Sequence, residues 1–188
     1  MNETWLQIGK ILSAIAPEIA QTLNLPASQD QVSSLEQRLD VSLPESFKSY
    51  LLTFDGQHLD YLMPLLGYNC FLSIKEIIEF WEMQVSTFED EEIISHLTEN
   101  KVKPMFWNKK WIPISDFEAS NRLILDLDPG KNGLSGQIIK HYPGVDLESN
   151  EIVVANSFDE FSKEILKRLS ENKFKINDGV IEFDDYLI

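Results

Sequence analysis

Residues 102–128 read VKPMFWNKKWIPISDFEASNRLILDLD, and this stretch decides the class of fold. Short runs rich in branched and aromatic residues alternate here with turn-forming residues, a pattern typical of consecutive β-strands. Later segments continue the pattern as far as residue 155. The sequence therefore predicts strands at 102–107, 112–115, 122–128, 137–141 and 152–155, with a short earlier strand at 68–72.

Segments with helical spacing of apolar residues flank these strands on both sides. Residues 3–23 form one such segment, and we expect Pro17 to kink this helix or split it in two. Further helices are predicted to begin near Ser28, at Leu43-Pro44, after Ser73 and after Ser157, with the serines as N-caps. This order predicts an α+β fold with a mainly antiparallel sheet of about five to six strands and helices packed at the N-terminus, the middle and the C-terminus.

The C-terminal residues predict a β-hairpin over 173–184. A two-residue Asp178-Gly179 turn would bring opposite charges and two aromatic rings face to face across the strands. The predicted cross-strand pairs are Lys173 with Asp184, Lys175 with Glu182, and Phe174 with Phe183.

The length and composition are those of a globular protein with its own core. With 188 residues, 43% of them hydrophobic, we expect one domain over 1–188, with 1–23 as an N-terminal helical extension and 173–188 as a C-terminal hairpin and tail. The lone cysteine, Cys70, lies in an apolar stretch and is expected to be a buried structural thiol. Because no signal peptide or membrane span is evident, a cytoplasmic protein is expected.

The charge of the chain is strongly acidic, with 31 acids against 16 bases and a net charge of −15. This balance argues against nucleic-acid binding, which relies on Lys and Arg to neutralise phosphates. Eight acids and no Lys or Arg lie between residues 76 and 100, so this segment would attract a basic protein or simply keep the chain soluble. As a partner-binding surface it would consist of Glu82, Glu89, Asp90, Glu91 and Glu92.

No residue pattern predicts catalysis, a metal or a cofactor. The histidines His58, His96 and His141 lack neighbouring ligands at metal-site spacing. Asp126 and Asp128 would share one face of a strand and could bind a hard cation, as in a metal-dependent hydrolase, but a structural role at the turn that follows is favoured. The glycine-rich stretch 130–136 does not match a phosphate-binding loop and is better explained as a hairpin connection.

Bases and aromatic residues alternate over 101–111, as they do in some single-strand nucleic-acid binders. Four lysines are few against the overall charge, so we expect the aromatic rings to pack in the sheet and the lysines to solvate its edge. Trp107 and Trp111 are therefore predicted to serve stability more than recognition, with at least one of them buried.

Several segments together resemble the SUKH superfamily of Smi/Knr-type domains. The sharpest stretch is Lys103-Pro104-Met105-Phe106-Trp107-Asn108 followed by Trp111-Ile112-Pro113-Ile114. Further matching segments are Trp5…Ile8…Leu12…Ala16-Pro17, Leu43-Pro44-Glu45-Ser46-Phe47, Phe54-Asp55-Gly56-Gln57, Leu125-Asp126-Leu127-Asp128-Pro129 and Val154-Ala155-Asn156-Ser157-Phe158. The resemblance covers about residues 5–169. Family members often carry a glycine-rich turn before the Leu-Asp-Leu strand, where this chain has residues 116–121.

This resemblance implies an α+β binding module without catalytic residues. Bacterial relatives are regarded as immunity proteins that neutralise toxins, often nucleases, and fungal relatives resemble scaffolds in cell-wall signalling. The leading hypothesis is therefore an immunity protein that binds a cognate toxin, which we expect to be a basic nuclease. The alternative is a regulatory scaffold whose partner is another cellular protein.

Overall fold

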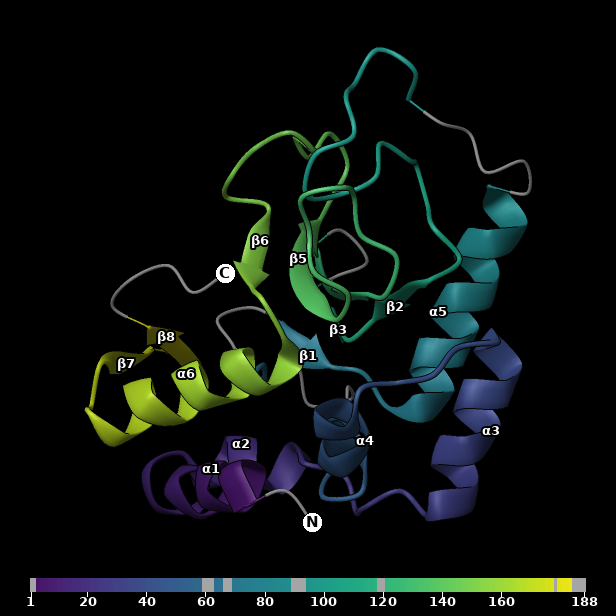
Figure 1. The fold of residues 1–188 in the computed structure, drawn as a ribbon. Helices are drawn as coiled ribbons and strands as arrows, with labels where there is room; N and C mark the ends of the chain where they lie inside the picture. Colours follow the sequence, from purple (N-terminus) through teal and green to yellow (C-terminus); the bar gives the residue numbers. More distant parts are fainter. Residues whose placement is uncertain are drawn as a thin grey trace.

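The computed structural model describes residues 3–58, 63–65, 69–88, 94–117, 121–177 and 179–183. The helices in this part of the chain are α1 (Glu3–Ile15), α2 (Pro17–Thr22), α3 (Gln29–Leu39), α4 (Glu45–Leu51), α5 (Ile74–Thr87) and α6 (Phe158–Ser170). The strands are β1 (Cys70–Phe71), β2 (Trp111–Pro113), β3 (Ser115–Asp116), β4 (Arg122–Asp126), β5 (Gln137–His141), β6 (Val153–Ala155), β7 (Phe174–Asn177) and β8 (Val180–Phe183). Figure 1 shows α1 and α6 on one side of the molecule, with α3 and α5 on the other.

Local residue chemistry sets where the helices begin. The hydroxyls of Ser28 and Ser73 each accept a hydrogen bond from the backbone N–H three residues on. The side chains of Gln31 and Glu76 in turn accept from the backbone N–H of the two serines, so α3 and α5 both start with a complete capping box. Ser157 caps α6 through the Glu160 backbone N–H. The proline in the N-terminal segment occupies the first turn of α2 and separates it from α1, as predicted.

The main sheet is antiparallel, with strand order β2-β4-β5-β6. Its register pairs Ile112 with Leu125, Ile124 with Ile139 and Ile138 with Ala155. The predicted α+β class and the antiparallel sheet are confirmed. The main sheet has four strands because β1 pairs with β3, and β7 with β8, in separate two-stranded ladders.

The strand predicted at 102–107 is wrong. This segment runs as bends with one isolated bridge residue, Met105, and the Met105 backbone N–H bonds to the Lys103 carbonyl across a tight turn. Pro104 lies inside the turn and has no N–H to offer a ladder. Val102 and Trp107 are nevertheless buried, so the apolar pattern reported burial and not strand geometry.

The core lies on both faces of the main sheet. Leu123 and Leu125 of β4 belong to the larger apolar cluster, which also contains residues of α1, α4 and α6. Ile124 lies between them on the opposite face of the strand and belongs to a smaller cluster with Trp107 and Trp111. The Trp5 indole N–H bonds to the Ser162 hydroxyl at 2.9 Å, which ties α1 to α6 inside the larger cluster. The N-terminal segment is thereby part of the core.

The C-terminal hairpin forms in the predicted register, with Phe174 opposite Phe183 and Lys175 opposite Glu182. Ile181 is fully buried against the larger cluster, so the hairpin packs on the fold. Asp178 and Asp184, which complete the predicted turn and the last pair, lie outside the described residues. No helix in the described ranges has both the length and the apolarity that a bilayer crossing requires.

Candidate functional site

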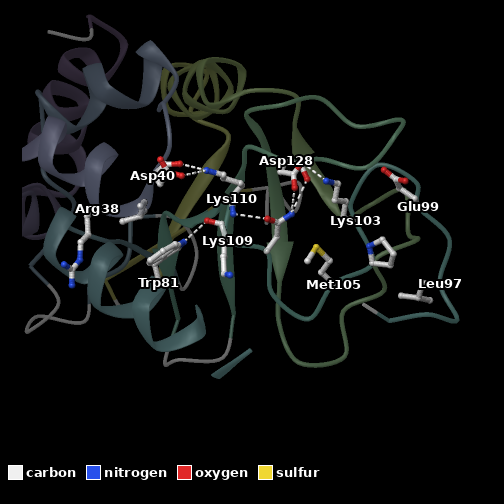
Figure 2. A pocket seen from close by; sticks show the side chains of 13 residues that line it. Arg38, Asp40, Trp81, Leu97, Glu99, Lys103, Met105, Lys109, Lys110 and Asp128 are labelled. Carbon is white, nitrogen blue, oxygen red and sulfur yellow. Dashed lines mark hydrogen bonds and ion pairs between the residues drawn. The ribbon is translucent and has the colours of Figure 1, made fainter. Parts of the chain in front are cut away.

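A groove of about 830 Å³ opens where the end of α3, the middle of α5 and the loop before β2 meet. Figure 2 shows side chains from these segments around it. Its apolar lining comes from Leu39, Trp81, Leu97, Pro104 and Met105. This volume is in the range of cavities that hold a ligand or several side chains of a partner protein.

The groove continues at both ends into neighbouring hollows. One, of about 480 Å³, shares Arg38, Trp81 and Lys109 with the groove and extends along α5. Another, of about 870 Å³, shares Asp40, Lys110 and Asp128. Together they form an elongated concave surface, which we call the α3–α5 groove.

The loop that forms one wall of the α3–α5 groove is held by hydrogen bonds. The Trp81 indole N–H donates to the Lys109 carbonyl at 2.9 Å. Asn108 is buried; its side-chain oxygen accepts the Lys110 backbone N–H at 2.9 Å, and its amide donates to the Asp128 carboxylate at 2.9 Å. The backbone of Lys109 and Lys110 is thus held in position by Trp81 of α5 and by Asp128, which follows β4.

Three ion pairs lie along the α3–α5 groove. Lys103 Nζ lies 2.6 Å from Asp128, Arg38 Nε lies 2.5 Å from Glu82, and Lys110 Nζ lies 3.7 Å from the Asp40 carboxylate. Lys110 also donates to the Asp40 carbonyl. Asp40 ends α3 in the left-handed conformation with φ 50°, where the helix leaves carbonyls for a cation to bind.

The surroundings of the Asp128 carboxyl favour its ionised form. Partial burial would raise the pKa of this carboxyl, but hydrogen bonds from Asn108 and Lys103 and the nearby charges of Lys103 and Lys110 outweigh it. The pKa of Asp128 is therefore lowered from its ordinary value, so the carboxylate stays ionised there.

Asp126 has a structural role. Its side chain is fully buried and accepts hydrogen bonds from the Trp111 indole at 3.1 Å, the Gln137 amide at 2.8 Å and the Asp128 backbone N–H at 3.0 Å. Burial raises its pKa to about 6, against the opposing effect of these bonds. The three donors are groups of the protein, and one of them is the Asp128 backbone N–H. The Asp126 carboxylate therefore holds the turn after β4, in which Asp128 lies.

The other candidate reactive groups are embedded in the fold. Cys70 is buried, and burial raises the pKa of its thiol to about 11, so little thiolate forms at neutral pH. His141 packs edge-on against Trp107 at 5.5 Å between ring centroids. Within the described residues no three His, Cys, Asp or Glu side chains gather as a metal site would require.

Trp107, before β2, and Trp111, the first residue of β2, are core residues. Trp107 is 2% exposed and Trp111 is fully buried, and their rings meet edge to face at 5.8 Å. The prediction that at least one of them is buried is confirmed for both. Lys103 precedes both tryptophans and Lys110 lies between them in the sequence. These lysines do not simply solvate a sheet edge, because each forms an ion pair in the groove.

Among the acidic residues predicted to bind a partner, Glu82 is described by the structure. It lies at one end of the α3–α5 groove, in the ion pair with Arg38. Glu89, Asp90, Glu91 and Glu92 lie outside the described residues. Sequence reasoning missed the groove itself. A signal was present in the sequence, where Asn108, Lys109 and Lys110 lie between Trp107 and Trp111.

The family profile of the SMI1 / KNR4 family (SUKH-1) matches residues 26–164. The chain belongs to this family. The predicted resemblance is therefore confirmed, and every side chain that lines the α3–α5 groove lies within the matched residues. Helices α1 and α2, the end of α6 and the C-terminal hairpin lie outside them.

Curated relatives in fungi match nearly the whole chain. The cell wall assembly regulator SMI1 of Saccharomyces cerevisiae is 24% identical over 222 residues, which cover 97% of this chain and 42% of that protein. The glucan synthesis regulatory protein of Neurospora crassa is 22% identical, with coverage of 95% and 40%. The cell wall biosynthesis/cell cycle regulator smi1 of Schizosaccharomyces pombe is also 22% identical, with 95% and 38%. The chain thus spans about two fifths of the length of these relatives.

Proposed function

We propose that this SMI1/KNR4-family chain is a non-catalytic regulatory protein that binds its partner protein in the α3–α5 groove. The observation that carries the proposal is the location of the groove, whose lining comes entirely from the residues that match the family. The groove also combines an apolar floor with charged side chains at its rim, the composition of a specific protein interface.

The names of the fungal relatives favour a regulatory role over the immunity role. All three are named for the regulation of cell wall or glucan synthesis, or of the cell cycle. We therefore propose a regulatory scaffold, which was the alternative in the sequence analysis, and toxin neutralisation, which was the leading hypothesis there, becomes the second. A cytoplasmic location, where such a partner would be met, is part of the proposal.

Two positive observations support a role without catalysis. The Asp126 carboxylate, the candidate for acid or metal chemistry, already accepts three hydrogen bonds that hold the Asp128 turn. The Cys70 thiol, the candidate nucleophile, is buried with a raised pKa. Both side chains are therefore committed to the fold.

In-cell photo-cross-linking tests this proposal. A photoreactive phenylalanine analogue replaces Met105 on the groove floor, and in a matched control it replaces Leu25, which is 86% exposed and precedes the family match. We expect one protein to be cross-linked from position 105 and not from position 25, with identification by mass spectrometry. Identical products from both positions would contradict a partner site in the groove.

The identity of the cross-linked protein separates the two hypotheses. A component of wall synthesis or its signalling supports the regulatory role, and deletion of the chain should then sensitise cells to wall-damaging agents. A secreted toxin supports immunity, and co-expression of the chain should then rescue growth of cells that express that toxin. Recovery of neither class, together with turnover of a substrate by the purified chain, would refute both.

A further inference from the structure

The side chain of His141 packs against both ends of the loop that walls the α3–α5 groove. This wall consists of residues 108–110, and a buried tryptophan lies at each end of it. The half-buried ring of His141 meets Trp107 at 5.5 Å and Trp111 at 5.8 Å between centroids. It also forms a hydrogen bond with the Phe106 backbone. A titratable ring and the groove wall are thus joined through residues that are neighbours in the chain.

Among the described residues, the charged groups that face His141 come from two strands. Arg122 of β4 is its partner in the β4–β5 register, and Asp116 of β3 lies 2.9 Å from the Arg122 Nε. From α5 and β6 the neighbouring side chains are apolar, Phe80 and Val153. Arg122 is only 6% exposed. A positive charge on His141 would therefore lie beside a buried cation, in surroundings that solvate charge poorly.

Protonation of His141 would also add a hydrogen-bond donor where acceptors are lacking. Within the described part of the chain, the Nδ1 atom of His141 and the Nε1 atom of Trp107 are buried without a hydrogen-bond partner. A protonated imidazole carries an N–H on both nitrogens, so Nδ1 becomes a donor in acid. A buried donor that stays unsatisfied is destabilising. The protonated ring therefore favours an arrangement in which Trp107 moves away and water reaches Nδ1.

The other side of the groove wall is attached through individual hydrogen bonds. The Trp81 indole N–H donates to the Lys109 carbonyl at an exposed position, drawn as a dashed line in Figure 2. The Asn108 amide donates to the Asp128 carboxylate at 2.9 Å. The first of these bonds joins two neutral groups, and such a bond gives only a small net stabilisation. It is therefore the contact that we expect to open first when the packing of Trp107 is disturbed.

We propose that protonation of His141 loosens residues 106–110, so that the α3–α5 groove keeps its wall at neutral pH and loses it in mildly acidic conditions. This regulation rests on the function proposed above, because its consequence is release of the partner protein from the groove. Burial and, to a smaller degree, the Arg122 charge lower the pKa of His141 below the ordinary 6.5 in the closed form. In the loosened form the ring meets water and regains the ordinary pKa, so acidification shifts the equilibrium toward loosening.

The buried carboxyl of Asp126 titrates in the same range but acts in the opposite direction. Burial raises its pKa to about 6, against hydrogen bonds from Gln137, the Asp128 backbone and Trp111. A raised pKa means that the folded form takes up the proton more readily than the unfolded form does. Acidification through this group therefore favours the closed wall, and loosening in acid has to come from another group.

Nuclear magnetic resonance of the purified chain tests the proposal, with the Lys110 backbone N–H as the reporter. This N–H bonds to the Asn108 side chain at 2.9 Å inside the groove wall. Its protection factor is the intrinsic rate of hydrogen exchange divided by the observed rate at the same pH. We expect the protection factor to fall about tenfold between about pH 7.5 and about pH 5.5, the factor that corresponds to a pKa difference of one unit between the two forms.

Two variants with the same substitution provide the comparison. His141→Gln removes the titrating group, and we expect it to hold the Lys110 protection factor within about twofold over the same range. His58→Gln makes the change at an exposed residue beside the end of α2 and should behave as wild type. Circular dichroism and thermal melts establish that each variant is folded. If His141→Gln does not fold, the His141 ring signals and the Trp81 indole signal of wild type are titrated instead, and they should share one midpoint.

Three results would overturn the proposal. A constant protection factor in wild type would show that the groove wall does not respond to pH. An equal fall in wild type and His141→Gln would assign the response to another group. Different midpoints for the His141 and Trp81 signals would separate the ring from the wall.

The outcome is distinguishable from failure of the proposed function. Cross-linking from position 105 at neutral pH does not depend on His141. If it captures a partner while the protection factor stays constant, the partner site stands and only its regulation is wrong. If the protection factor falls as expected while cross-linking captures nothing specific, the pH-sensitive wall stands and the partner site is wrong.

Discussion

His141 shows how a single titratable residue is fitted into the smaller apolar cluster. Its ring meets those of Trp107 and Trp111 at 5.5 and 5.8 Å between centroids, and it lies opposite Arg122 in the β4–β5 register. Burial, aided by the Arg122 charge, lowers its pKa below the ordinary 6.5, although a hydrogen bond with the Phe106 backbone acts in the opposite direction. The fold therefore holds this imidazole neutral.

A pH dependence of stability follows from this neutral ring. As the pH falls below about 6.5, His141 takes up a proton in the unfolded chain before it does so in the fold, so the free energy of unfolding decreases. Replacement by Gln removes this dependence. We expect the wild-type value to fall more than that of His141→Gln in urea titrations between about pH 7.5 and about pH 5.5.

Asp126 contributes to the same titration with the opposite sign. Its folded pKa of about 6 lies above the ordinary 3.8, so its contribution to stability is fully present below 3.8 and is lost as the pH rises through 6. Both proteins retain Asp126, and the comparison between them therefore isolates the histidine. Equal slopes for wild type and variant would contradict a neutral, half-buried His141.

At the scale of elements, α5 connects the core to the groove. Its N-terminus is fixed by the Ser73 capping box, and the Asp55 carboxylate accepts the Ile74 backbone N–H at 2.7 Å. Gly56, with φ 68°, lets the chain pass close to this point, since a Cβ there would lie 2.4 Å from the Leu72 backbone. Two turns further on, the same helix places Trp81 on the Lys109 carbonyl.

Loss of the α5 cap should weaken both stability and the groove wall. We expect Ser73→Ala to lower the free energy of unfolding by about 1 kcal/mol, because backbone donors in the first turn lose their acceptor. Amide hydrogen exchange should speed up first in that turn. Ser86→Ala, on the exposed side of α5, removes a hydroxyl bonded to the Met83 carbonyl and should change stability by less than about 0.5 kcal/mol. Equal losses in the two variants would show that the cap is not the cause.

For the whole molecule, net charge is the dominant long-range effect. A charge of −15 on 188 residues opposes compaction, and the ion pairs at the surface are mostly exposed and individually worth little. The four consecutive acids Glu89–Glu92 concentrate this repulsion in one segment. Like charges next to one another along the chain are expected to lower the stability of the isolated chain slightly.

Salt should therefore stabilise the protein. We expect the melting temperature to rise with NaCl concentration as repulsion is screened. Replacing Glu89, Asp90, Glu91 and Glu92 with Gln should leave the melting temperature at low salt unchanged or slightly higher, and should reduce its dependence on salt. A melting temperature that falls with added salt would mean that attractive ion pairs outweigh the repulsion.

By itself, the sequence determined the features that depend on neighbours along the chain. The serine caps, the break at Pro17, most of the strands and the hairpin register all follow from contacts within a few residues or across one turn. The interactions that stabilise these features form between residues close in the sequence, so the residue pattern alone predicts the features.

Only the tertiary structure decided how 102–107 runs and where the groove lies. The apolar run 102–107 could satisfy its buried residues as a strand or as an irregular loop, and packing of Trp107 under α5 selected the loop. The groove joins Arg38 of α3, Trp81 of α5 and Asp128 after β4, residues that no spacing relates. The charged residues of the groove come together because the helices and the sheet bury their apolar faces against one another. The free energy of this burial depends on the whole core and not on any single segment.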